Sequence, residues 1–187
     1  KALKLMLASP DQILDWSQEF YNKDTMVLCR YNAPLIKFGL TLIKKGIVVG
    51  TSSSTLKSTL VDTVKNRNAK TMAELTQKLS VYENICMQGG DQFTKSNIKD
   101  KFDAIRYILQ ECSSIEDYYD KVNTLTNPRK NSVHVKLSTV HRAKGLEAQT
   151  IGILNPPLQS SKATTPVQRL QEENVNFVGH TRSKKDM

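Results

Sequence analysis

The sequence is poor in cysteine and has no long apolar run, and each absence excludes a class of protein. Cys29, Cys86 and Cys112 are odd in number and far apart, so neither a disulfide framework nor a Cys-x-x-Cys zinc site is expected. No stretch reaches the roughly 18 apolar residues of a membrane helix. The chain starts at Lys1, without an initiator Met or an apolar leader. We therefore expect a cytoplasmic protein that contacts no membrane, and a chain that begins inside a longer protein.

Acidic residues are scarce relative to basic ones. Lys and Arg total 27 against 18 Asp and Glu, which gives a net charge of +9 and a pI of about 9.5. This balance favours a polyanionic partner, nucleic acid first. The length of 187 residues is sufficient for one good core and a small insertion.

A complete phosphate-binding loop is missing as well. The segment 50–55 is rich in Gly, Ser and Thr, but no second glycine followed by Lys and Ser or Thr completes the pattern. We interpret this segment as a loop and N-cap for a helix at 56–64. No Asp-Glu pair ends an apolar strand, and no metal site is predicted from the sequence.

The apolar pattern predicts an α/β fold with a mainly parallel sheet. Strands are expected at 3–7, 25–29, 47–49, 133–137 and 150–154, and helices at 10–21, 32–45, 56–64, 71–82, 95–112, from 113 or 114 to about 122, and from 167 onward. The helices between 51 and 127 interrupt the alternation of strands and helices. We therefore expect an α/β domain formed by 1–50 and 128–187, with 51–127 as an inserted helical subdomain.

The densest polar cluster follows the strand at 133–137 and reads Thr139-Val140-His141-Arg142-Ala143-Lys144-Gly145-Leu146-Glu147. Open α/β sheets place their ligands at the carboxyl ends of strands, where such a cluster would lie. A solvated loop with capping charges is the alternative interpretation. Similar clusters follow other apolar segments at 30–32 and 181–183, and arginines gathered at one sheet edge would suit phosphate.

Three segments resemble motifs of the UvrD/Rep/PcrA-type superfamily 1 DNA helicases. Residues 139–147 resemble motif V, T-x-H-x-A-K-G-L-E, and this match is the most specific. Residues 172–183 resemble motif VI, with Phe177-Val178-Gly179 and Thr181-Arg182-Ser183. Residues 27–33 resemble the family's Y-R-x-N-A segment, a match that is weak alone. Motif VI departs from the family at Glu173-Asn174, His180 and Ser183.

The resemblance implies the second RecA-like domain of an ATP-dependent helicase, with 51–127 in place of subdomain 2B as in compact phage and prophage members. The Walker A and B elements belong to an upstream RecA-like domain, which would hold most of the ATP and Mg²⁺. The isolated chain is therefore expected to be inactive. Motif IV would also lie before Lys1, and translocation from 3′ to 5′ follows only by family analogy.

Carried over by position, the resemblance assigns each site residue a role. Arg182 would be the catalytic arginine that reaches the γ-phosphate of ATP. Lys144, Gly145 and Glu147 would lie at the nucleotide. The single strand, or the strand at a duplex junction, would contact Arg30, Asn32, Thr139, His141 and Arg142.

Two other hypotheses remain open from the residues alone. The chain could be a non-catalytic, helicase-like module that holds DNA or a partner, in which case the longer protein would lack Walker A. It could also be a helical scaffold with accidental motifs, in which case Arg30, His141 and Arg182 would lie on opposite faces.

Overall fold

One parallel sheet forms the centre of the molecule. The computed structural model describes residues 6–8, 24–51, 53–127, 135–154 and 166–180. Within them, β1 (Met6–Ala8), β2 (Thr25–Cys29), β3 (Val49–Gly50), β4 (Val135–Thr139) and β5 (Thr150–Leu154) form a sheet in the order β1-β5-β2-β4-β3. Every pairing among these strands is parallel. The predicted α/β class is confirmed, and the arrangement is consistent with a RecA-like fold.

The central strand β2 is buried on both faces. All five of its residues are buried, as its continuous apolar run predicts. Val27 and Cys29 belong to the larger core cluster, whereas Met26 and Leu28 belong to a second cluster. Because side chains alternate along a strand, these clusters lie on opposite faces of the sheet.

Helix α2 (Asn32–Lys44) follows β2 and ends where the sequence predicts. Gly46 has a φ of 77°, and its amide donates to the carbonyl of Ile43. The amide of Ile47 donates to the carbonyl of Leu42, which completes a Schellman ending. Because the Ile47 amide is part of this helix ending, it is not available for strand pairing, and β3 covers Val49–Gly50 rather than the predicted 47–49.

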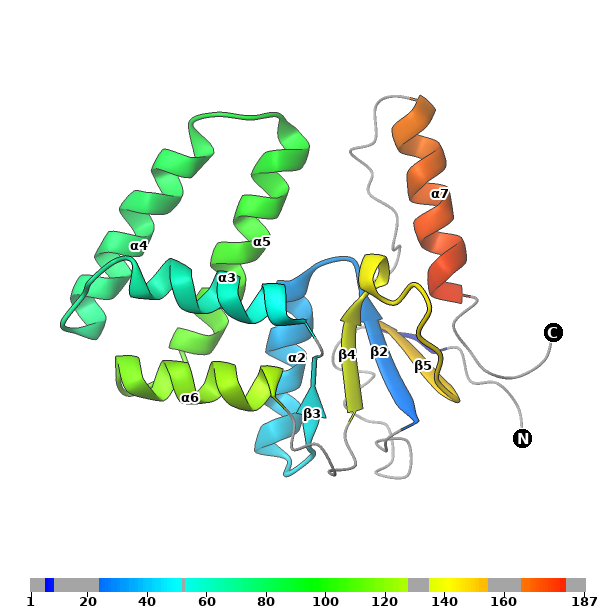
Figure 1. Cartoon of the computed structure of the whole chain (residues 1–187), viewed down its shortest axis with the longest axis horizontal. Coiled ribbons are helices and arrows are strands. Elements are labelled where there is room, and N and C mark those ends of the chain that lie inside the picture. The colour runs from blue at the N-terminus through cyan, green and yellow to red at the C-terminus, as the bar shows by residue number, and fades with distance from the viewer. Residues whose placement is uncertain (1–5, 9–23, 52, 128–134, 155–165, 181–187) are drawn as a thin grey trace.

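Four helices form the segment predicted as an insert: α3 (Ser54–Lys65), α4 (Met72–Met87), α5 (Gln92–Leu109) and α6 (Ile115–Thr126). They lie on one side of the sheet, where α5 packs along α2 and α3 packs along α6 (Figure 1). Their buried residues belong to the same core cluster as those of α2 and β4. The segment therefore shares its core with the sheet, and the division of the chain at 51 and 127 stays a prediction.

Side-chain caps fix the starts of these helices. Ser53, Thr71, Asp91 and Ser114 each accept a hydrogen bond from a backbone amide three residues ahead. The predicted Thr71–Glu74 capping box is half formed, because the Glu74 carboxylate accepts from the amide of Lys70 instead of Thr71. Asp91 starts α5 three residues before the predicted 95, and α4 runs five residues beyond the predicted 82.

Strand β4 extends to Thr139, two residues beyond the predicted end, because 135–139 pair with β2 and β3. A 3-10 turn, η2 (Val140–Arg142), follows directly. Helix α7 (Pro166–His180) agrees with the helix predicted from 167 onward and lies against η2. The helix predicted at 10–21 lies outside the described residues. No helix in the described part of the chain is both long and apolar enough to cross a membrane.

Candidate functional site

The carboxyl edge of the sheet brings two of the predicted clusters together. Cys29 and Thr139 are paired across β2 and β4, and each is the last residue of its strand. Arg30 and η2 therefore leave the sheet side by side. This adjacency follows from the parallel register, because both polar segments come immediately after paired strand ends.

Arg30 is the centre of a charged contact at this edge. Its two terminal nitrogens, Nη1 and Nη2, donate to the two carboxylate oxygens of Glu172 on α7, both at 2.7 Å. The side chains are 6% and 12% exposed, so this bidentate pair is largely shielded from water. The same Nη1 lies 3.3 Å from Nε2 of His141 in η2. One contact thus joins three segments that resemble helicase motifs.

Burial and the neighbouring Arg30 together set the protonation state of His141. A guanidinium is a donor only, so Nε2 of His141 accepts and the ring proton belongs on Nδ1. Loss of hydration beside Arg30, and then the positive charge of Arg30 itself, lower the pKa of His141 below its ordinary 6.5, while Glu172 raises it less. His141 is therefore neutral near pH 7, although the residue as a whole is exposed. A contact from this ring to DNA would be a hydrogen bond rather than an ion pair.

Asn32 is held from the other side by Asp100 of α5. Asp100 accepts from the Asn32 backbone amide at 2.9 Å, the Asn32 side-chain amide at 3.0 Å and the Ala33 amide at 2.7 Å. The N-cap residue Tyr31 supplies no side-chain cap to α2. A carboxylate from a distant helix therefore satisfies amides that would otherwise be open at the start of α2.

The loop 139–147 is anchored through its small residues and presents its charged ones. Ala143 and Ala148 are buried, and the Ala143 amide donates to the carbonyl of Thr139 at 3.0 Å. Gly145 has a φ of 82°, and a side chain there would meet no atom within 4 Å. The glycine is therefore needed for its backbone conformation and not to leave room for a neighbouring group. Lys144 and Glu147 are exposed and form no ion pair within the described residues.

The remaining predicted residues differ in accessibility. Thr139 is 8% exposed, and it lines a pocket together with Arg142, which is exposed. Arg182 lies outside the described residues, so its position relative to His141 is not given. Beside Arg30, burial raises the pKa of the Cys29 thiol to about 11, and a thiol that stays protonated at neutral pH is a poor nucleophile.

Glu172 and Asp100 are site residues that the sequence interpretation did not assign. The sequence showed Glu172 as the acidic start of the motif VI-like segment, but it did not show that Arg30 is its partner. For Asp100 the available signal was indirect: α2 begins with no acidic residue in its first turn, so its amides need an acceptor from elsewhere. Nothing along the chain indicates which carboxylate supplies it.

Comparison of the chain with protein-family models, curated proteins and solved structures gave no match. The resemblance to superfamily 1 helicases in three segments therefore stays a prediction from those segments.

Proposed function

We propose that this chain is the second RecA-like motor domain of an ATP-dependent superfamily 1 DNA helicase or translocase. The observation that carries the proposal is the contact of Arg30, His141 and Glu172 at one edge of a parallel sheet. These residues lie in the three segments that resemble family motifs. Motif-like segments that matched by accident would have no physical reason to meet at the edge where α/β folds bind ligands.

The exposed loop suits a nucleotide held mainly by another domain. Lys144 and Glu147 face solvent, and the backbone at Gly145 is open to approach. ATP and Mg²⁺ would be bound chiefly by the upstream domain, with Arg182 supplying positive charge to the transferring phosphoryl group. The chain by itself offers half of such a site, and the partner surface would be the upstream RecA-like domain of the same protein.

The decisive experiment uses the longer protein that carries the upstream domain. Arg182→Ala is expected to lower ATP turnover by roughly a thousandfold or more while ATP binding is largely kept. Arg182→Lys should restore little, because an ammonium cannot reproduce the guanidinium fork. Lys184→Ala is the matched control, since it removes a nearby cation that has no assigned role. Turnover by Arg182→Ala at the level of Lys184→Ala would reject the assigned role.

The purified 187-residue chain provides a second test. We expect it to hydrolyse no ATP, alone or with single-stranded DNA. Sustained hydrolysis by this chain would contradict a half-site. If the longer protein binds DNA but lacks ATPase activity altogether, the non-catalytic, helicase-like module is the better description.

A further inference from the structure

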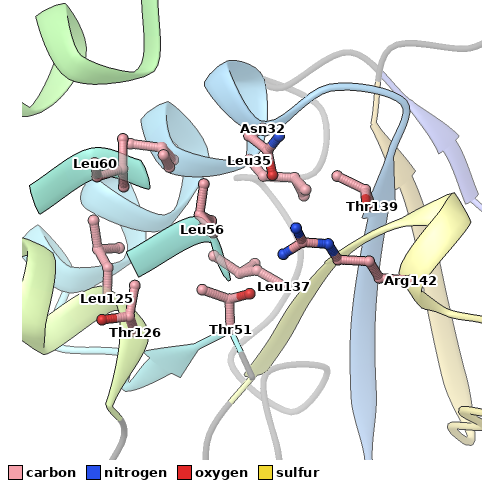
Figure 2. A pocket seen from close by; sticks show the side chains of 11 residues that line it. Asn32, Leu35, Thr51, Leu56, Leu60, Leu125, Thr126, Leu137, Thr139 and Arg142 are labelled. Atoms are coloured by element: carbon pink, nitrogen blue, oxygen red, sulfur yellow. The ribbon is translucent and has the colours of Figure 1, made fainter. Parts of the chain in front are cut away.

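A groove runs beside β4, from Lys136 near the start of the strand to its carboxyl end, and faces the start of the helical segment. It consists of two adjoining pockets that share Thr51, Thr126 and Leu137. One pocket has an apolar floor of leucine and isoleucine side chains from α2, α3, α6 and β4 (Figure 2). The other is lined mainly by polar side chains from α3, β4 and the residues that follow α6. We call the two together the β4–α3 groove.

Cations line this groove along its length. Arg142 comes from η2, and Figure 2 shows its guanidinium reaching past the end of β4 toward the side chains of Leu56 and Leu137. Lys57 of α3 and Lys136 of β4 line the adjoining pocket. Among the described residues, no aspartate or glutamate lines either pocket.

These three cations are not neutralised by acidic side chains in the part of the chain that the structure describes. Within the described residues, none of them forms an ion pair, in contrast to Arg30, Arg106 and Lys121. Three positive charges in a groove with apolar walls repel one another and attract an anion, because field lines concentrate where the walls have a low dielectric constant. The groove is therefore prepared for a negatively charged ligand.

The polar groups select among anions. Beside the cations lie the hydroxyls of Thr51, Ser54 and Ser138 and the side-chain amide of Asn127. Cations together with hydroxyl donors match the phosphates of a nucleic-acid backbone. None of the described residues that line the two pockets is aromatic, so the inference does not rely on stacking of bases.

We infer that the β4–α3 groove binds the phosphodiester backbone of single-stranded DNA, with Lys57 and Lys136 as phosphate contacts. This inference rests on the proposed function and extends it, because Lys57 belongs to the helical segment and lies outside all three motif-like segments. The strand would pass from the loop 139–147 toward α3. Recognition would be independent of sequence, since phosphate contacts position a strand without reading its bases.

Binding of a fluorescein-labelled oligothymidylate to the 187-residue chain tests the inference by fluorescence anisotropy over a range of salt. The variant Lys57→Ala/Lys136→Ala should bind about tenfold more weakly at roughly 0.1 M salt. Its slope of log affinity against log salt should be smaller by about 1.4, because each lost phosphate contact on a single strand removes about 0.7. Lys57 is half-buried and Lys136 exposed, so circular dichroism should show an unchanged fold.

The matched control is Lys65→Ala/Lys70→Ala. It removes the same net charge, but from exposed lysines at and beyond the far end of α3. Near wild-type affinity and slope in this control, with losses in the groove variant, would support the inference. Equal losses in both variants would overturn it, because only net charge would matter.

The groove inference and the proposed function can be wrong independently, and the experiments distinguish the two cases. If the groove variant binds like the wild type while Arg182→Ala abolishes turnover in the longer protein, the groove inference is wrong and the motor proposal stands. If the wild-type chain binds no oligothymidylate even at low salt, the groove inference is wrong whatever the ATPase result.

Discussion

The segment 30–32 and the loop 139–147 leave the same sheet edge, yet they differ in how their polar groups are used. Arg30 and Asn32 have internal partners, Glu172 and Asp100. Lys144 and Glu147 in the loop face solvent without ion pairs inside the described part of the chain. Sequence alone assigned both segments to ligand contact. In the structure, polar groups of the segment 30–32 bind side chains of α5 and α7, whereas Lys144 and Glu147 of the loop present their charges to solvent.

This difference bears on Arg30 most directly. A guanidinium that already makes a bidentate contact with a carboxylate at 2.7 Å has fewer donors left for a phosphate. Contact of Arg30 with DNA would require Glu172 to share or release it. The contact also ties α7, the helix that precedes Arg182, to the strand that precedes Asn32. Under the proposed function, this pair would link the nucleotide to the edge that contacts DNA.

The largest expected effect comes from breaking the tie at Arg30. Arg30→Ala removes the guanidinium that makes the bidentate contact with the shielded Glu172 carboxylate, and we expect the free energy of unfolding to fall by about 3–5 kcal/mol. Urea denaturation monitored by circular dichroism measures it. Lys144→Ala is the control from the exposed loop and should change stability by less than about 0.5 kcal/mol.

A double replacement sharpens this result. Arg30→Met/Glu172→Leu removes both charges together and should recover most of the loss, because neither member of this ion pair is then left without the other. Equal losses from Arg30→Ala and Lys144→Ala would contradict the division between the two regions.

Removal of the hydrogen bonds between Asp100 and the start of α2 should lower the free energy of unfolding by a smaller amount. Asp100→Ala leaves the first amides of α2 without their acceptor, and we expect a loss of about 1–3 kcal/mol. Asp91→Ala is the matched control, because Asp91 caps its own exposed helix α5 through the Thr94 amide at 2.8 Å. That local cap should contribute about 1 kcal/mol. If Asp100→Ala costs no more than Asp91→Ala in the same denaturation assay, the link between α5 and the segment 30–32 is weaker than the geometry indicates.

The smallest expected effect is a pH dependence from His141, the residue where the two regions meet. Its pKa in the folded chain lies below the ordinary 6.5, so the unfolded state binds more protons around and just below pH 6.5. Stability should therefore rise with pH through this window and fall toward acid. His141→Gln should flatten this part of the profile, as measured by urea denaturation at a series of pH values. An identical profile in the variant would show that the folded environment does not lower the pKa of the ring.

The sequence was informative where local physics decides the structure. The apolar run of β2 predicted its burial on both faces, and Gly46 predicted the end of α2 because few other residues adopt a positive φ cheaply. The strand at 150–154 was predicted with its observed bounds. Errors of two and three residues arose where pairing or a side-chain cap extended an element, at Thr139 and at Asp91 respectively.

What the sequence determined by itself is the class of fold and the identity of the polar groups at the sheet edge. Only the tertiary structure decided which of those groups have a hydrogen-bond or ion-pair partner inside the protein. Arg30 and Glu172 are 142 residues apart along the chain, and Asn32 and Asp100 are 68 apart. Any of the 18 acidic residues could have been the partner of either on composition alone. Helix packing makes that choice, because it brings one carboxylate to each of these two residues and leaves the loop 139–147 open.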